Sequence, residues 1–252
     1  MLFPFAVLAM LAGPSVAGIL LIGLIHGRAG FRDLLTRMTR WRVGARWYAV
    51  ALLTAPLSVM ASLFALSLLS PAFLPGILTT SDKASLLLMG IAVGLGAGIF
   101  EELGWTGFAV SGLRPRYGVL TTGLIVGLLW GAWHFLVNVW ASGSASGALS
   151  LAIYLPAILF TLLVGQLPAF RVLMVWVYDR TGSLLVAILM HTSLTASTLI
   201  FAPLATGVAP LTVALAYAAA LWVGVAAVAV ANGGHLSRQL RQPRQALRRR
   251  VA

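Results

Sequence analysis

The stretch Phe100-Glu101-Glu102-Leu103-Gly104-Trp105 places two adjacent carboxylates in the middle of a long apolar run. The chain of 252 residues contains only five acidic residues, so these two are a large share of them. A carboxylate inside a membrane costs about 3 kcal/mol on insertion scales, so it must face a partner or a wet cavity, or take up a proton. The rest of the chain therefore has to supply partners for Glu101 and Glu102.

The composition is typical of an all-α polytopic membrane protein. Hydrophobic residues make up 60% of the chain and charged residues 9%, whereas a soluble domain carries about 25% charged residues. Apolar runs of about 20 residues can cross a bilayer only as helices, because every backbone polar group must be satisfied internally. The chain has no cysteine, which excludes a disulfide, a thiol nucleophile and a cysteine-based metal site.

The apolar runs predict seven membrane-spanning helices in one domain. They cover approximately residues 3–25, 47–69, 84–113, 119–140, 148–178, 183–201 and 211–231. We expect a single integral membrane domain over residues 1–232, with its motifs in 84–201, and a basic cytoplasmic tail over 233–252. Between the first two runs, residues 28–46 form either a short amphipathic helix on the membrane surface or a plain loop that sets topology.

The positive residues predict the orientation. With seven spans, 16 of the 17 Lys and Arg residues fall in segments 26–46, 114–118, 171–182 and 232–252. Loops rich in Lys and Arg stay on the cytoplasmic side, so the N-terminus is expected outside and the C-terminus inside. This distribution indicates membrane topology and excludes nucleic acid as the partner. The boundary near Arg171 is the least well defined, because the fifth run is long.

Small residues recur every four positions on three predicted helices, and each series leads to an ionisable residue. The series are Gly90, Gly94 and Gly98 before the glutamate pair; Gly123, Gly127 and Gly131 before His134; and Ser183 and Ala187 before His191 and Thr195. Such stripes let membrane helices pack backbone to backbone. We therefore expect a glutamate, His134 and His191 to point inward and toward one another.

The spacing within the glutamate pair leaves one choice open. Adjacent helical residues point about 100° apart, so both glutamates cannot face one point. Gly98 precedes Glu101 by three residues and Glu102 by four, and both spacings lie on the same helix face.

One glutamate and two histidines in a dry interior allow two kinds of chemistry. The glutamate can act as general base on a water molecule, with a histidine assisting or binding the oxyanion. The trio Glu101, His134 and His191 can also bind zinc, because two histidines and a glutamate with an open position form a catalytic zinc set. The sequence contains neither an HExxH motif nor a GxSxG motif, and Ser193 follows His191 too closely to be its nucleophile.

The order of these elements resembles the CPBP family, the CAAX proteases and bacteriocin-processing proteins. The resemblance rests on the Glu pair, on the Trp-Gly-x-x-His element that ends at His134, and on the late His191-x-x-x-Thr195. It also includes Arg40-Trp41-Arg42-Val43-Gly44, Arg46-Trp47-Tyr48 and Tyr178-Asp179-Arg180-Thr181-Gly182-Ser183, and it spans about residues 28–197.

The resemblance implies an all-helical intramembrane endopeptidase that acts on membrane-associated or prenyl-type peptides and proteins. Glu101 would be the base on water, Glu102 its support, His134 a second site residue, and His191 the group that binds the oxyanion or orients water. The family has been read both as zinc metalloproteases and as enzymes that need no metal, so the cofactor is either zinc or none.

Two positions depart from the family pattern. Thr106 stands where the family has an arginine after the Glu pair, and Thr195 stands where it has an asparagine. Thr106 can donate one hydrogen bond but supplies no charge, so Glu102 is expected to be protonated or rotated. The departures also allow an alternative function, an impaired family member that serves as a bacteriocin self-immunity factor or a membrane scaffold.

Overall fold

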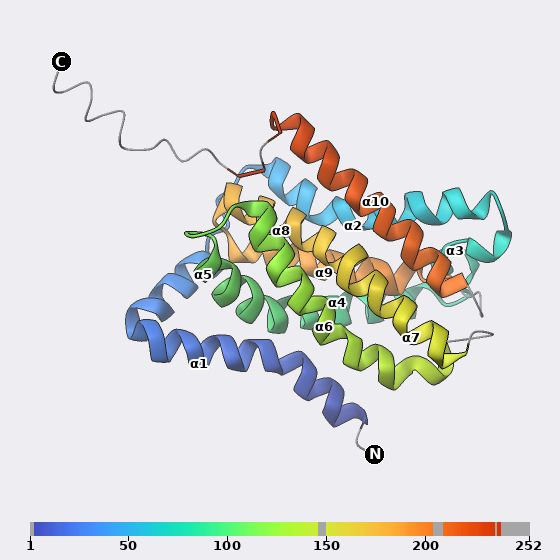
Figure 1. The fold of residues 1–252 in the computed structure, drawn as a ribbon, viewed down its shortest axis with the longest axis horizontal. Coiled ribbons are helices and arrows are strands. Elements are labelled where there is room, and N and C mark those ends of the chain that lie inside the picture. Colours follow the sequence, from blue (N-terminus) through green and yellow to red (C-terminus); the bar gives the residue numbers. More distant parts are fainter. Residues whose placement is uncertain (1–2, 146–149, 204–208, 235, 238–252) are drawn as a thin grey trace.

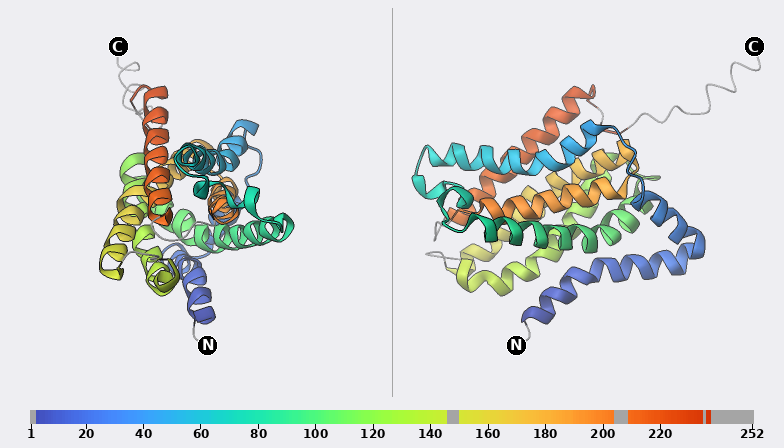
Figure 2. Two further views of the ribbon diagram at one scale, coloured as in Figure 1. Left: turned by 90° about the vertical axis from the view of Figure 1, so that its right-hand side faces the viewer. Right: turned by 180° about the vertical axis from the view of Figure 1, so that it is seen from behind.

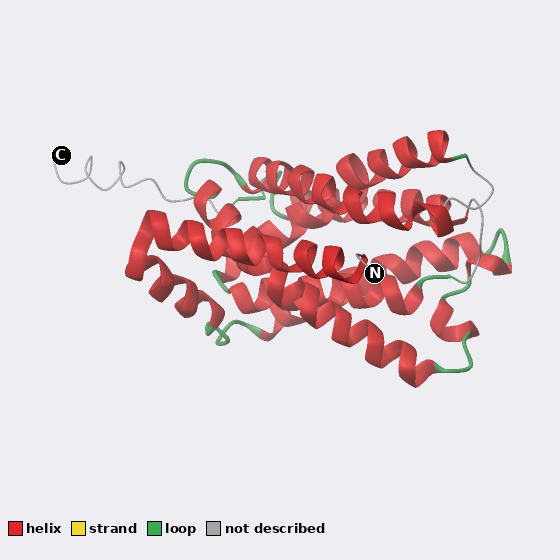
Figure 3. Ribbon diagram, turned by 90° about the horizontal axis from the view of Figure 1, so that it is seen from below, coloured by secondary structure: helices red, strands yellow, loops and turns green. Residues whose placement is uncertain are grey.

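The computed structural model describes residues 3–145, 150–203, 209–234 and 236–237, and the secondary structure in this part of the chain is entirely helical (Figures 1 and 3). The long helices are α1 (Phe3–Met38), α2 (Ala45–Ser67), α4 (Lys83–Gly104), α6 (Val119–Ala145), α7 (Leu151–Phe160), α8 (Leu167–Thr181), α9 (Leu184–Phe201) and α10 (Ala209–Ala231). A 3-10 turn η1 (Pro71–Phe73) and the short helix α3 (Gly76–Thr79) connect α2 to α4. The predicted all-α fold is confirmed.

The helices have the length and the apolar surface of membrane spans. Among the described residues, six helical segments are long and apolar enough to cross a bilayer, and Val119–His134 in α6 is a shorter apolar stretch. Large apolar side chains such as Leu57, Leu88 and Val223 are exposed on the outside of the bundle, where lipid can cover them. The chain is an integral membrane protein, with α1 and α10 along opposite edges (Figures 1 and 2).

Two of the spans contain a π-helical segment. The third span runs through α4, η2 (Trp105–Val110) and α5 (Ser111–Leu113), and the fifth runs through α7, η3 (Thr161–Gln166) and α8. The fifth span continues past its prolines rather than breaking at them. Such π segments change the direction of the side chains that follow, and they occur often at functional sites.

The segment between the first two spans is helical. Helix α1 changes direction at Gly27, where the backbone φ is 55°, and its second part continues to Met38. A glycine adopts this left-handed conformation without the steric cost that a side chain would bring. The structure therefore favours the predicted short helix over a plain loop.

The basic segments meet at one end of the bundle. Arg114 pairs with Asp179, Arg180 donates to Asn232 Oδ1 at 3.0 Å, and Ser183 Oγ donates to the Arg40 carbonyl at 2.6 Å. These contacts agree with the alternation of seven spans, and the assignment of this end to the cytoplasm stays a prediction. Most of the predicted basic tail lies outside the described residues.

Arg171 corrects one boundary. We expected it in a cytoplasmic loop over 171–182, but the side chain lies inside α8 with 0% exposure. Helix α8 ends at Thr181, close to the predicted end of the fifth run at 178, so Arg171 lies within the span and not in the cytoplasmic charge segment to which it was assigned. The prediction assigned Arg171 to the loop charges that set membrane topology, whereas this arginine is buried within an apolar helix.

The glycine stripes bring the helices into backbone contact, as predicted. A Cβ atom on Gly94 would lie 2.6 Å from the Thr192 carbonyl oxygen, and one on Gly98 would lie 2.5 Å from Thr192 Oγ1, so α4 packs directly on α9. The stripe on α6 packs in the same way on α8 and η3, with Gly123 against Val172. The Glu pair of α4 thereby lies within hydrogen-bond reach of side chains on α6, α8 and α9.

The stripe predicts a position-specific effect of adding a methyl group. Gly94→Ala should lower the free energy of unfolding by about 1–3 kcal/mol, because the methyl meets a backbone carbonyl that cannot move aside. Gly96→Ala is the matched control, since a Cβ there has no neighbour within 4 Å, and it should leave stability unchanged or slightly raised. Unfolding followed by circular dichroism in one detergent measures both; equal losses would contradict the backbone contact.

Candidate active site

Glu102 is a fully enclosed polar group of the site. Its side chain has 0% exposure and accepts hydrogen bonds from three other elements of the fold. Oε1 lies 2.7 Å from Nδ1 of His191, and Oε2 lies 2.8 Å from Nη1 of Arg171. The hydroxyl of Thr106 also donates to Oε2. Glu102 thus joins α4 to α8, α9 and η2.

Glu101 faces a different neighbour. Its side chain is 3% exposed, and Oε2 accepts a hydrogen bond from Nε1 of Trp130 on α6 at 2.8 Å. The glycine stripe on α4 therefore leads to Glu102, which meets α9, while Glu101 points about 100° away toward α6. The choice that the spacing left open is resolved, because each glutamate addresses a separate helix.

The indole of Trp130 connects the two halves of the site. The guanidinium of Arg171 lies 4.1 Å from the ring centroid, within the range of a cation–π contact. The rings of His191 and His134 stand edge-on to the same indole, at centroid distances of 5.0 and 5.3 Å. The two histidines and both glutamates are thereby held around one aromatic ring.

The predicted residues take up different places in this arrangement. His134 has Nδ1 at 3.0 Å from the Trp130 carbonyl oxygen, and it lies within electrostatic range of Glu101, Arg171 and His191. Thr195 lies one helical turn beyond His191 on α9 and is half-buried. The predicted set Glu101, Glu102, His134 and His191 is brought together, and the catalytic role of each member stays a prediction.

Comparison with known proteins agrees with this arrangement. Residues 83–197, which contain the whole cluster, match the family model described as "Type II CAAX prenyl endopeptidase Rce1-like". This match supports membership of the CPBP family. A segment of 39 residues is also 44% identical to the "CAAX prenyl protease 2" of Methanococcus maripaludis, and it spans 16% of this chain and 14% of that relative.

The structure corrects what we expected of Glu102. The loss of the family's arginine at Thr106 predicted a carboxyl group without a cation, either protonated or rotated. Arg171 supplies that cation from α8, and Thr106 adds the single hydrogen bond that its hydroxyl can donate. Arg171 Nη1 is 3.5 Å from Thr106 Oγ1, so both side chains reach the same oxygen of Glu102.

Sequence reasoning missed two residues of the site, Trp130 and Arg171. Trp130 was noticed only as part of a motif, although an indole N–H in an apolar interior needs an acceptor. Arg171 was counted with the loop charges, although two buried carboxylates require at least one cation nearby. The need for charge balance was therefore the signal that could have found Arg171.

The arrangement does not fit the zinc set considered for Glu101, His134 and His191. Across the described residues, no three His, Asp or Glu side chains gather closely enough to hold a metal ion.

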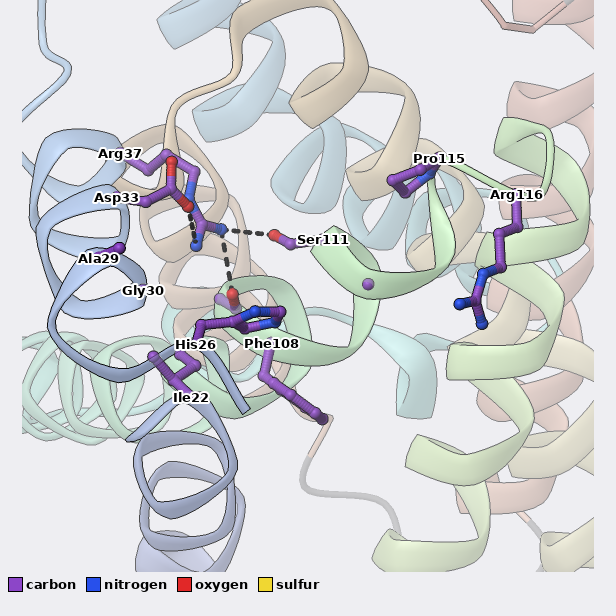
Figure 4. A pocket seen from close by; sticks show the side chains of 12 residues that line it. Ile22, His26, Ala29, Gly30, Asp33, Arg37, Phe108, Ser111, Pro115 and Arg116 are labelled. Carbon is purple, nitrogen blue, oxygen red and sulfur yellow. Dashed lines mark hydrogen bonds and ion pairs between the residues drawn. The ribbon is translucent and has the colours of Figure 1, made fainter. Parts of the chain in front are cut away.

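Two cavities border the site without including its carboxylates or imidazoles. An apolar cavity of about 280 Å³ lies between α1 and the end of α4, with Gly104, Trp105 and Trp133 among its lining residues. A second cavity of about 540 Å³ lies toward the basic end, where Arg37 pairs with Asp33 and donates to the Gly107 carbonyl and the Ser111 hydroxyl (Figure 4).

The different surroundings of the glutamates predict different effects on stability. Glu102→Gln should lower the free energy of unfolding by about 3–5 kcal/mol, because it leaves the buried Arg171 without a counter-charge. Glu101→Gln keeps the shape and gives up one charged acceptor for Trp130, which should cost about 1 kcal/mol. Thermal unfolding of the two variants side by side in one detergent checks this; a reversed order would contradict the assigned partners.

Proposed function

We propose that this protein is an intramembrane endopeptidase that hydrolyses peptide bonds of membrane-associated or prenylated substrates. The observation that carries the proposal is the second carboxylate. Glu102 pairs with Arg171, whereas Glu101 accepts a hydrogen bond from Trp130 and lies within electrostatic range of His134. A second acidic group kept in a membrane interior is costly, and such groups mark functional sites. The match to a prenyl endopeptidase model supports the same reading.

In the proposed reaction, Glu101 acts as general base. It takes a proton from a water molecule, whose oxygen attacks the carbonyl carbon of the scissile peptide bond. The Nε2 lone pair of His191 orients this water by accepting a hydrogen bond from it, and His134 assists the water or the leaving group. The proton passes to the amide nitrogen, the C–N bond breaks, and the products are a carboxylate and an amine.

The surrounding contacts suit these roles. The Trp130 N–H fixes one oxygen of Glu101 and leaves the other for a water molecule. Glu102 binds Nδ1 of His191, which leaves Nε2 as the ring atom that can accept a hydrogen bond from the attacking water. Because Glu101 is only 3% exposed, water and substrate need a local opening. The apolar cavity lined by Trp105 and Trp133 lies next to the site and suits a hydrocarbon group on the substrate.

The cellular setting is part of the proposal. The partners are the lipid bilayer and a peptide or protein held in it, and we place the chain in a bacterial inner membrane with its basic end in the cytoplasm. Loops rich in arginine remain on that side. The substrate's peptide bond would then reach the site from within the membrane or from its cytoplasmic face.

The alternative of an impaired family member, acting in bacteriocin self-immunity or as a scaffold, has lost one of its two supports. It rested on Thr106 and Thr195, and Arg171 now occupies the place of the missing charge next to Thr106. The departure at Thr195 remains. This alternative predicts that Glu101→Ala keeps the cellular phenotype, whereas the peptidase proposal predicts that the phenotype is lost.

The proposal is tested by hydrolysis of prenylated and unmodified hydrophobic peptides with the purified full chain. Glu101→Gln and His134→Gln should each lower turnover by about 100-fold or more, because they remove proton transfer without large changes of shape. His26→Gln is the matched control, since His26 is exposed on α1, and it should retain turnover. Wild-type turnover that survives both site substitutions would show that the assigned site is wrong.

A further inference from the structure

We propose that Arg171 is a positioning residue that sets the hydrogen-bonding state of His191 and the orientation of Glu101. The inference rests on the proposed function, because it assigns Arg171 a part in the same reaction. Arg171 touches neither of these two side chains through a hydrogen bond. It acts through Glu102 on one side and through Trp130 on the other.

The first path runs through Glu102. A buried carboxyl group without a cation tends to take up a proton, and it would then donate a hydrogen bond rather than accept one. The Arg171 guanidinium lies 2.8 Å from Oε2 of Glu102 and has 0% exposure, so it favours the ionised carboxylate at this place. An ionised Glu102 can only accept, so the Nδ1 atom of His191 at 2.7 Å must carry the proton. In neutral His191 this leaves the lone pair on Nε2.

The second path runs through Trp130. The guanidinium lies 4.1 Å from the centroid of the indole whose N–H is bonded to Glu101. A planar guanidinium can lie against an aromatic face and donate to a carboxylate at the same time, whereas the point charge of a lysine does this poorly. Glu101 and Glu102 point in different directions because they are neighbours on one helix. Arg171 links their orientations, because it contacts both Glu102 and the indole that binds Glu101.

Thr106 lies close enough to Arg171 for the positive charge to be moved from position 171 to position 106 by substitution. Arg171 Nη1 lies 3.5 Å from Thr106 Oγ1, and both groups contact Oε2 of Glu102. If Arg171 is shortened to alanine, an arginine introduced at position 106 has both the vacated space and the same acceptor within reach. A role that depends on this charge should be restored by the relocation, whereas a role in packing α8 should not.

The first experiment measures peptide hydrolysis by the full chain in lipid nanodiscs. Arg171→Met should lower kcat by about 100-fold with little change in KM, as expected when a histidine loses its correct tautomer. Arg171→Ala combined with Thr106→Arg should recover at least about 10-fold of the turnover that Arg171→Ala loses. Wild-type turnover in Arg171→Met, or no recovery on relocation of the arginine, would overturn the inference while leaving the proposed function intact.

The second experiment does not depend on turnover. Nitrogen-15 NMR of histidine-labelled protein reports which ring nitrogen carries the proton, and His191→Gln identifies the signal. The wild type should show the Nδ1–H form at His191, and Arg171→Met should lose it. An unchanged Nδ1–H signal in Arg171→Met would overturn the inference. If the wild type shows no hydrolysis but the tautomer depends on Arg171, the proposed function fails and the positioning role stands.

A third variant covers the case in which Arg171→Met does not fold. Arg171→Lys keeps a buried cation near Glu102, so the Nδ1–H form of His191 should persist. The contact with Trp130 is weakened, and turnover should fall by about 10-fold. Loss of the tautomer in this variant, or full turnover, would contradict the two paths assigned to Arg171.

Discussion

A carboxylate and a guanidinium face each other at 2.8 Å in the middle of the helix bundle, and neither side chain has any exposed surface. Removing two such charges from water costs several kcal/mol for each ion, and mutual attraction offsets this only with good geometry and further hydrogen bonds. Thr106, His191 and the face of Trp130 supply those contacts around Glu102 and Arg171. Four helices must therefore meet closely, and the glycine stripes of α4 and α6 make that approach possible.

The same constraint separates the roles of the adjacent glutamates. The carboxylate of Glu102 accepts hydrogen bonds from a guanidinium, a hydroxyl and an imidazole, so both of its oxygens are engaged in contacts that hold the site together. Glu101 is held by one indole N–H and keeps an oxygen for chemistry. A helix turns about 100° per residue, and this lets neighbours in the sequence face α9 and α6 respectively. Adjacent carboxylates in this membrane protein thus have different surroundings: Glu102 holds the site together, and Glu101 is the one that we propose reacts.

Much of this arrangement was predictable from the sequence, and the parts that were not have physical causes. Apolar runs and small-residue spacing predicted the spans, the close packing of the helix faces that carry glycine stripes, and the gathering of His134 and His191 near the glutamates. Arg171 was missed because position relative to an apolar run does not say whether a cation sets topology or meets a buried anion. The contacts of Trp130 and the π segments depend on tertiary packing, which no local pattern encodes.

The central claim is that the Glu102–Arg171 pair organises the site, and a double-mutant cycle tests it most directly. The free energy of unfolding would be measured in mixed detergent micelles for Glu102→Leu, Arg171→Met and the double variant. Each single change should cost about 3–5 kcal/mol because it leaves a buried charge unpaired, and the double variant should cost less than either. Losses that simply add in the double variant would show that the two side chains do not depend on each other.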